Sequence, residues 1–199
     1  MLHKFEFRRQ VMHILLGIII VALYSYSIIN PLMILILLIV GVFLSFLSTR
    51  FEIPVISWFL KKFERRKVKK TFPGKGVFFY LLGVFLVMLI FNKNTALAAI
   101  TILALGDGIS HIIGRYFGKT KTFLSRYKLI EGSIAGFVAS SVGASLFVSP
   151  WKAIIASAVA MTVELVELKI SEETVDDNLV VPLVAAAMIY ILDKVHLVI

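Results

Sequence analysis

The sequence predicts an all-α fold, a polytopic integral membrane bundle of about seven transmembrane helices. Hydrophobic residues make up 59% of the 199 residues and the mean hydropathy is +0.95, whereas a soluble domain contains roughly 45–50% apolar residues. The apolar residues gather in seven segments, and the basic residues gather in alternate connections between them. A water-soluble fold is therefore excluded.

Each apolar segment approaches the roughly 20 residues that an α-helix needs to cross about 30 Å of hydrocarbon. Asn30 and Pro31 separate the first two segments, so we expect these two to form a tight antiparallel pair. The fourth is expected to be interrupted near its end by Gly106-Asp107-Gly108. In chain order the segments cover about 11–29, 32–48, 77–91, 95–113, 132–149, 152–168 and 179–198.

The basic residues predict the orientation in the membrane. All but three of the 21 Lys and Arg residues lie before the first segment or in every second connection after it, the exceptions being Lys93, Lys152 and Lys194. Because positive residues mark the cytoplasmic side, we expect a cytoplasmic amino terminus, an external carboxyl terminus and cytoplasmic loops at about 49–76, 114–131 and 169–178. Residues 1–199 are expected to form one integral membrane domain.

Composition also limits the chemistry. The chain contains no cysteine, which excludes disulfide scaffolds, thiolate metal sites and cysteine nucleophiles. The loop at 49–76 mixes aromatic and basic residues. That mixture indicates an interfacial helix that anchors on anionic lipid headgroups, with a role in gating substrate entry as the alternative.

Two acidic residues, Asp107 and Glu164, fall inside predicted spans. A carboxylate in the bilayer costs about 2.5–3.5 kcal/mol on insertion scales, so an acid at such a position needs a partner, a wet cavity or a function. Both acids are expected at a shallow depth near the cytoplasmic side. A structural ion pair that fixes helix packing is the alternative to a functional role.

The predicted loop at 114–131 has the composition of a phosphate site. Arg115, Lys119 and Lys128 accompany Gly114 and Gly118, and cations together with backbone amides surround phosphate in such sites. The spacing does not complete a Walker A motif.

Two further stretches combine small, basic or acidic residues. Lys75 lies between two glycines and either contacts phosphate or marks the membrane boundary. Asp176, Asp177 and Asn178 precede the last span, where they either cap the helix or bind a hard cation such as Mg²⁺, which carboxylates and substrate phosphates hold together.

Several short motifs follow one another along most of the chain. They are Glu6-x-Arg8-Arg9-x3-His13-x3-Gly17, Pro73-Gly74-Lys75-Gly76, Gly106-Asp107, Gly114-Arg115-x2-Gly118-Lys119, Lys128-x2-Glu131-Gly132-Ser133, Glu164, and Asp176-Asp177-Asn178-x3-Pro182. In this order they resemble the CTP-dependent polyprenol and lipid kinases, a family that includes dolichol kinase, phytol kinase and yeast-type diacylglycerol kinase. The chain departs from the usual pattern at Gln10, His111 and Leu129.

The resemblance implies Mg²⁺-assisted transfer of phosphate from CTP to a membrane lipid alcohol at the cytoplasmic face. The alcohol would be polyprenol-like, dolichol-like or diacylglycerol, with CTP and the bilayer as the other partners and no nucleic acid. The catalytic residues that the resemblance implies are Asp107, Lys128 and Glu131. The implied nucleotide-binding residues are Gly114, Arg115, Gly118, Lys119, Lys75 and Lys128, the metal ligands are Asp107, Glu131, Asp176 and Asp177, and the further site residues are Arg9, His13, Glu164 and Asn178.

Two other functions stay open at this point. The segment 125–132 matches a phosphatidate cytidylyltransferase-like loop at four of its eight positions, but lacks that loop's Pro, second Lys and Thr. Alternatively, Asp107 and Glu164 line the ion path of a small cation- or proton-coupled transporter.

Overall fold

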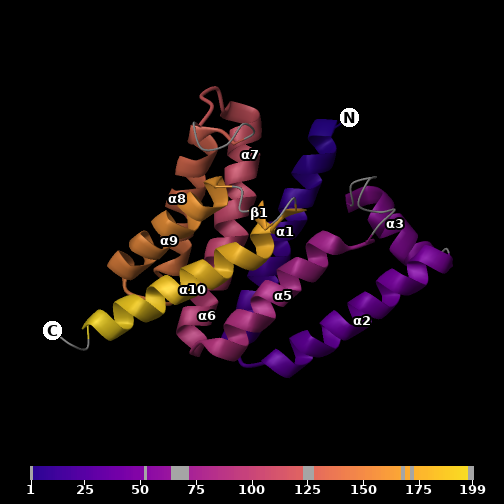
Figure 1. Ribbon diagram of the computed structural model, residues 1–199, viewed down its shortest axis with the longest axis horizontal. Coiled ribbons are helices and arrows are strands. Elements are labelled where there is room, and N and C mark those ends of the chain that lie inside the picture. Colours follow the sequence, from indigo (N-terminus) through magenta and orange to yellow (C-terminus); the bar gives the residue numbers. More distant parts are fainter. Residues whose placement is uncertain are drawn as a thin grey trace.

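The computed structural model describes residues 2–51, 53–63, 72–122, 128–166, 169–170 and 173–196, and over these the chain is a helical membrane bundle (Figure 1). Two-residue antiparallel strands, β1 (Lys169–Ile170) and β2 (Glu173–Thr174), precede the last helix. The helices are α1 (Leu2–Ser25), α2 (Pro31–Arg50), α3 (Pro54–Phe63), α5 (Lys75–Ile90), α6 (Lys93–Thr101), the π-helix η1 (Ile102–Asp107), α7 (Gly108–Phe117), α8 (Ile130–Ala144), α9 (Pro150–Leu165) and α10 (Asp177–His196). The predicted all-α bundle is confirmed.

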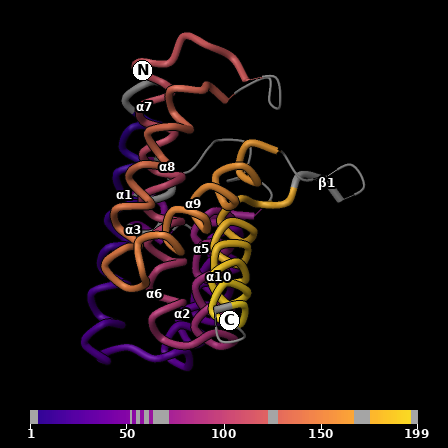
Figure 2. Tube along the Cα trace, turned by 90° about the vertical axis from the view of Figure 1, so that its left-hand side faces the viewer, coloured from indigo at the N-terminus to yellow at the C-terminus, as the bar shows by residue number. Residues whose placement is uncertain are grey.

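Four stretches of helix are long and apolar enough to cross a membrane, namely Phe5–Ser25, Pro31–Arg50, Lys93–Phe117 and Asp177–Val195. Helices α5 and α8 are apolar but shorter. The start of α1 and the end of α10 lie toward opposite ends of the bundle (Figure 2).

The break between the first two helices lies where the sequence predicts it. The Asn30 side chain accepts a hydrogen bond of 3.0 Å from the Met33 amide, and Pro31 occupies the first turn of α2. Both features favour a helix start. The predicted tight pairing of these helices is wrong, because α2 packs against α5 and a large cavity lies between α1 and α2.

The fourth predicted span is continuous, so the predicted interruption at Gly106-Asp107-Gly108 is also wrong. Helices α6, η1 and α7 follow one another without a break. The two glycines serve close packing instead. A Cβ atom at Gly106 would lie 2.7 Å from Met161 Sδ, and one at Gly108 would lie 2.8 Å from Ile14 Cδ1, so the helix keeps its course while α1 and α9 approach it.

The connections carry less regular structure. Helix α3 occupies part of the loop predicted to hold an interfacial helix, and its contact with the membrane surface stays a prediction. Many basic residues of that loop lie at 64–70, outside the described residues. Near α3's end, Lys62 Nζ lies 4.5 Å from the centre of the Trp58 ring.

Candidate active site

Asp107 ends the π-helical turn and is buried, with 6% of its surface exposed. Imidazoles flank its carboxylate on both sides. His111 Nε2 lies 3.2 Å from Asp107 Oδ1, and His13 Nε2 lies 3.4 Å from Oδ2. The same His13 nitrogen lies 3.4 Å from the Leu103 carbonyl oxygen, and the ring packs edge-on against Tyr80. Two imidazoles from α1 and α7 therefore hold one buried carboxylate.

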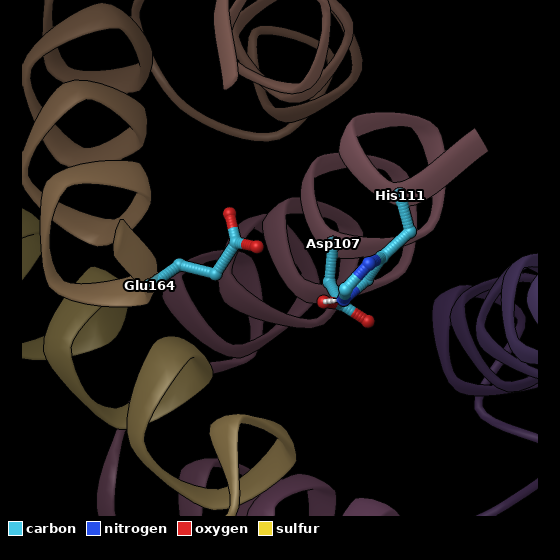
Figure 3. Close-up of side chains that lie close together, drawn as sticks. All are labelled: Asp107, His111 and Glu164. Carbon is cyan, nitrogen blue, oxygen red and sulfur yellow. Dashed lines mark ion pairs between the residues drawn. The ribbon is translucent and has the colours of Figure 1, made fainter. Parts of the chain in front are cut away.

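The second intramembrane acid, Glu164, comes from the end of α9 and is 2% exposed. Its side chain points across the bundle toward Asp107 and His111 (Figure 3). Ser110 Oγ lies 3.2 Å from Glu164 Oε1 and 3.0 Å from the Asp107 carbonyl oxygen. The two acids that the sequence places inside membrane spans therefore lie close together in the fold, and their depth in the membrane stays a prediction.

Lys128 connects this pair to the start of α10. Its ammonium donates hydrogen bonds to Glu164 Oε1 at 3.0 Å, to the Glu164 carbonyl oxygen, and to Asp177 Oδ2 at 3.1 Å. Burial alone lowers the pKa of Lys128, but the neighbouring carboxylates of Glu164 and Asp177 outweigh it and raise the pKa above the ordinary value. Lys128 is therefore charged at neutral pH.

A π turn brings these groups together. In η1 the backbone winds more widely than in an α-helix, and such turns are frequent at functional sites. Asp107 is the last residue of this turn and His111 lies one α-helical turn later, so both side chains project from the same face. Close packing between α7 and α8, where a Cβ atom at Gly132 would lie 2.8 Å from Gly114 Cα, brings Lys128 beside them.

Two cavities meet at this cluster. The larger has a volume of about 970 Å³ and runs between α1, α2 and α5. Its wall is apolar along Leu37, Leu38, Val42 and Leu81, and at one end it turns polar, where Arg9, His13, Asp107, Lys128, Asp176, Asp177, Asn178 and Lys75 lie. The smaller cavity, about 280 Å³, lies between α1, α7 and α8. Gln10 and Lys128 line both cavities.

The smaller cavity contains other predicted residues. Gly114, Arg115 and Glu164 line it, together with His111 and Ser110. Gly118 and Lys119 line neither cavity, and Lys119 is exposed. The structure therefore brings part of the predicted nucleotide-binding stretch into the cluster and leaves Gly118 and Lys119 outside both cavities.

Glu131 lies apart from the acidic cluster. Its carboxylate accepts hydrogen bonds of 3.0 and 3.3 Å from the Thr120 amide. Backbone hydrogen bonds, with that of Glu131 itself the largest, hold the pKa of this carboxyl below its usual range. Its described partners assign this residue to ordering the loop between α7 and α8.

Asp176 and Asn178 interact with each other. Asp176 Oδ1 accepts hydrogen bonds from the Asn178 amide at 3.2 Å and from Asn178 Nδ2 at 2.8 Å, an arrangement typical of a helix cap. Burial raises the pKa of the Asp176 carboxyl. Of Asp176, Asp177 and Asn178, Asp177 is thus the residue that contacts Lys128.

Three residues of the site were not assigned roles from the sequence: His111, Ser110 and Gln10. His111 follows Asp107 by four residues inside a predicted helix, and this spacing could have indicated their contact. Ser110 and Gln10 are buried polar residues within apolar helices, and their positions alone gave no such signal.

The chain is similar to several curated proteins. An uncharacterized protein of Methanocaldococcus jannaschii is 29% identical over 92% of both chains. The CTP-dependent diacylglycerol kinase 1 of Schizosaccharomyces pombe is 26% identical over 59% of this chain and 60% of its own length. A probable chloroplastic phytol kinase of Triticum aestivum is 25% identical over 67% of this chain and 49% of its own length.

These relatives support a CTP-dependent lipid kinase family. The chain spans 60% or less of the length of the relatives that are named as kinases. No family model matches the chain, and no solved structure is significantly similar to it.

Proposed function

We propose that this protein is a CTP-dependent, Mg²⁺-assisted kinase that phosphorylates the hydroxyl group of a membrane lipid alcohol, polyprenol-like or diacylglycerol, at the cytoplasmic face. Relatives named as CTP-dependent diacylglycerol kinases and phytol kinases support the reaction class. The single structural observation that carries the proposal is that a large, mainly apolar cavity and a smaller cavity lined by Arg115 have Lys128 in both of their walls.

The larger cavity fits the lipid acceptor. A lipid alcohol needs an apolar channel for its chain and a polar end for its hydroxyl group, because each part must leave its solvent at little cost. The wall between α1, α2 and α5 supplies the apolar channel for the chain. The end with His13, Asp107 and Asp177 supplies the polar site for the hydroxyl group.

The smaller cavity fits the phosphates of the donor. Arg115 and Lys128 line it, and both side chains offer N–H donors to phosphate oxygens. Because Lys128 also lines the larger cavity, it lies where the transferred phosphoryl group would pass from donor to acceptor.

Phosphoryl transfer depends mainly on positioning and on charge neutralisation. The lipid oxygen bonds to the γ-phosphorus as the bond from that phosphorus to the bridging oxygen breaks. CDP leaves with the bonding electrons, and the hydroxyl proton passes to a carboxylate at the polar end of the cavity. Asp107 and Asp177 would hold Mg²⁺ there, since carboxylates and phosphates together hold this ion, and the bound ion would neutralise phosphate charge.

A product assay tests the proposal. Purified protein in detergent is incubated with Mg²⁺, CTP labelled at the γ-phosphate, and diacylglycerol, phytol or a polyprenol. We expect labelled lipid phosphate with at least one of these alcohols, and a loss of at least about 10²-fold in the Asp107→Asn variant. Absence of labelled lipid with every alcohol would contradict the proposal.

A further inference from the structure

Asp107, His111 and Glu164 form a group of potential metal ligands. Each offers one ligand atom, and these atoms all lie within 4.8 Å of one another. Figure 3 shows Glu164 reaching from α9 toward Asp107 and His111 on the neighbouring helix. Two carboxylates and one imidazole converge from two helices that the fold packs side by side.

The charge of the cluster is unbalanced. The carboxylates of Asp107, Glu164 and Asp177 share one lysine ammonium among the described residues, that of Lys128, and the imidazoles add positive charge only when protonated. Buried charges are costly unless they are paired or coordinate a metal. A divalent cation would offset the excess negative charge.

Glu164 provides an independent sign of a missing ligand. Ser110 and Lys128 engage its Oε1 atom. Its Oε2 atom is buried and has no hydrogen-bond partner among the described residues. An unpaired carboxylate oxygen in a residue that is 2% exposed costs free energy, and it is free to coordinate an ion without displacing Lys128.

We propose that Asp107, His111 and Glu164 hold a divalent cation in the absence of nucleotide, and that this site favours Mn²⁺ over Mg²⁺. Carboxylates suit Mg²⁺ and Mn²⁺ alike, whereas an imidazole ligand favours a transition metal. His111 binds through Nε2, and the proton that this nitrogen now shares with Asp107 moves to Nδ1. The inference goes beyond the proposed function, in which Mg²⁺ accompanies CTP, and does not depend on it.

Electron paramagnetic resonance tests the site with Mn²⁺ alone. Protein treated with EDTA and desalted is titrated with MnCl₂ in detergent, without CTP or lipid. We expect about one bound Mn²⁺ per chain, which tenfold more Mg²⁺ does not displace. Glu164→Gln should weaken Mn²⁺ binding by at least about tenfold, while Asp193→Asn, in an ion pair with Lys152 outside the cluster, should leave it unchanged.

The imidazole ligand has its own signature. Pulsed resonance of the bound ion should show modulation from a coordinated nitrogen that disappears in His111→Asn and persists in His13→Asn. Absence of a single Mn²⁺ site in folded wild-type protein would overturn the inference, as would unchanged binding in Glu164→Gln or nitrogen modulation that survives in His111→Asn. Because no substrate is present, these outcomes are independent of the kinase assay.

Discussion

Lys128 Nζ lies 3.0 Å from Glu164 Oε1, across 36 residues of sequence. The contact joins the loop before α8 to the end of α9, and a second bond from the same ammonium reaches Asp177 at the start of α10. Three parts of the chain therefore meet at one half-buried cation, which lines both cavities.

Replacing Lys128 by Met should destabilise the fold as well as abolish activity. Removing one partner of a buried ion pair leaves the other charge uncompensated, which costs about 3–5 kcal/mol. Thermal unfolding in detergent measures this loss. Adding Glu164→Gln should restore part of the stability, because the uncompensated carboxylate is gone, but should restore no activity. A double variant as unstable as Lys128→Met would contradict this account of the pair.

A bulky residue at Gly41 should block the lipid acceptor. Gly41 lines the larger cavity, and a Cβ atom there would meet nothing within 4 Å. We expect Gly41→Trp to raise the KM for lipid alcohol by about tenfold and to leave the KM for CTP unchanged. Gly41→Ala serves as the matched control and should behave as wild type. Equal increases in both KM values would argue against separate cavities for donor and acceptor.

Gly132 should tolerate no side chain. An added Cβ atom would lie 2.8 Å from Gly114 Cα and 2.9 Å from its amide nitrogen, and it would also collide with the Ser110 carbonyl oxygen. Gly132→Ala should therefore lower the free energy of unfolding by about 1–3 kcal/mol. At Gly76 a Cβ atom would meet nothing within 4 Å, so Gly76→Ala should leave stability unchanged or raise it by up to about 1 kcal/mol. Equal effects would contradict the close approach of α7 and α8.

Glu131 should contribute to stability in a pH-dependent way. Hydrogen bonds depress the pKa of its carboxyl below the usual 4.5, so its contribution is complete above that pH and is lost as the pH falls through the folded-state pKa. The difference in Tm between wild type and Glu131→Gln should therefore be constant from pH 7 to 5 and shrink below about pH 4.5. A difference that grows at low pH would contradict the assigned hydrogen bonds.

The helices could be predicted because their signals are local. Apolar runs of spanning length indicated where chain segments cross the membrane, and Asn30 with Pro31 indicated the start of α2. The extension of α1 back to Leu2 escaped the prediction, since hydropathy detects the membrane-spanning part of a helix and not its polar end. A pair between Glu6 and Arg9 at 3.0 Å supports that end.

The site could be predicted only in part, because its geometry depends on tertiary packing. Asp107 and Glu164 were singled out because charge is rare inside a membrane span. The residue types do not indicate the π turn at Ile102–Asp107 or the Glu164 Oε2 atom that has no hydrogen-bond partner among the described residues. The resemblance likewise implied that Glu131 is a metal ligand. In the described fold its carboxylate instead accepts a hydrogen bond from the Thr120 amide.

The central claim is tested most directly by following two labels of CTP in parallel. The protein with Mg²⁺ and an accepted lipid alcohol receives CTP labelled either at the γ-phosphate or at the α-phosphate. We predict that the γ-label alone enters the lipid fraction and that CDP accumulates in equal amount. Entry of the α-label into the lipid when phosphatidate replaces the alcohol, with release of pyrophosphate from CTP, would contradict the kinase and establish a cytidylyltransferase.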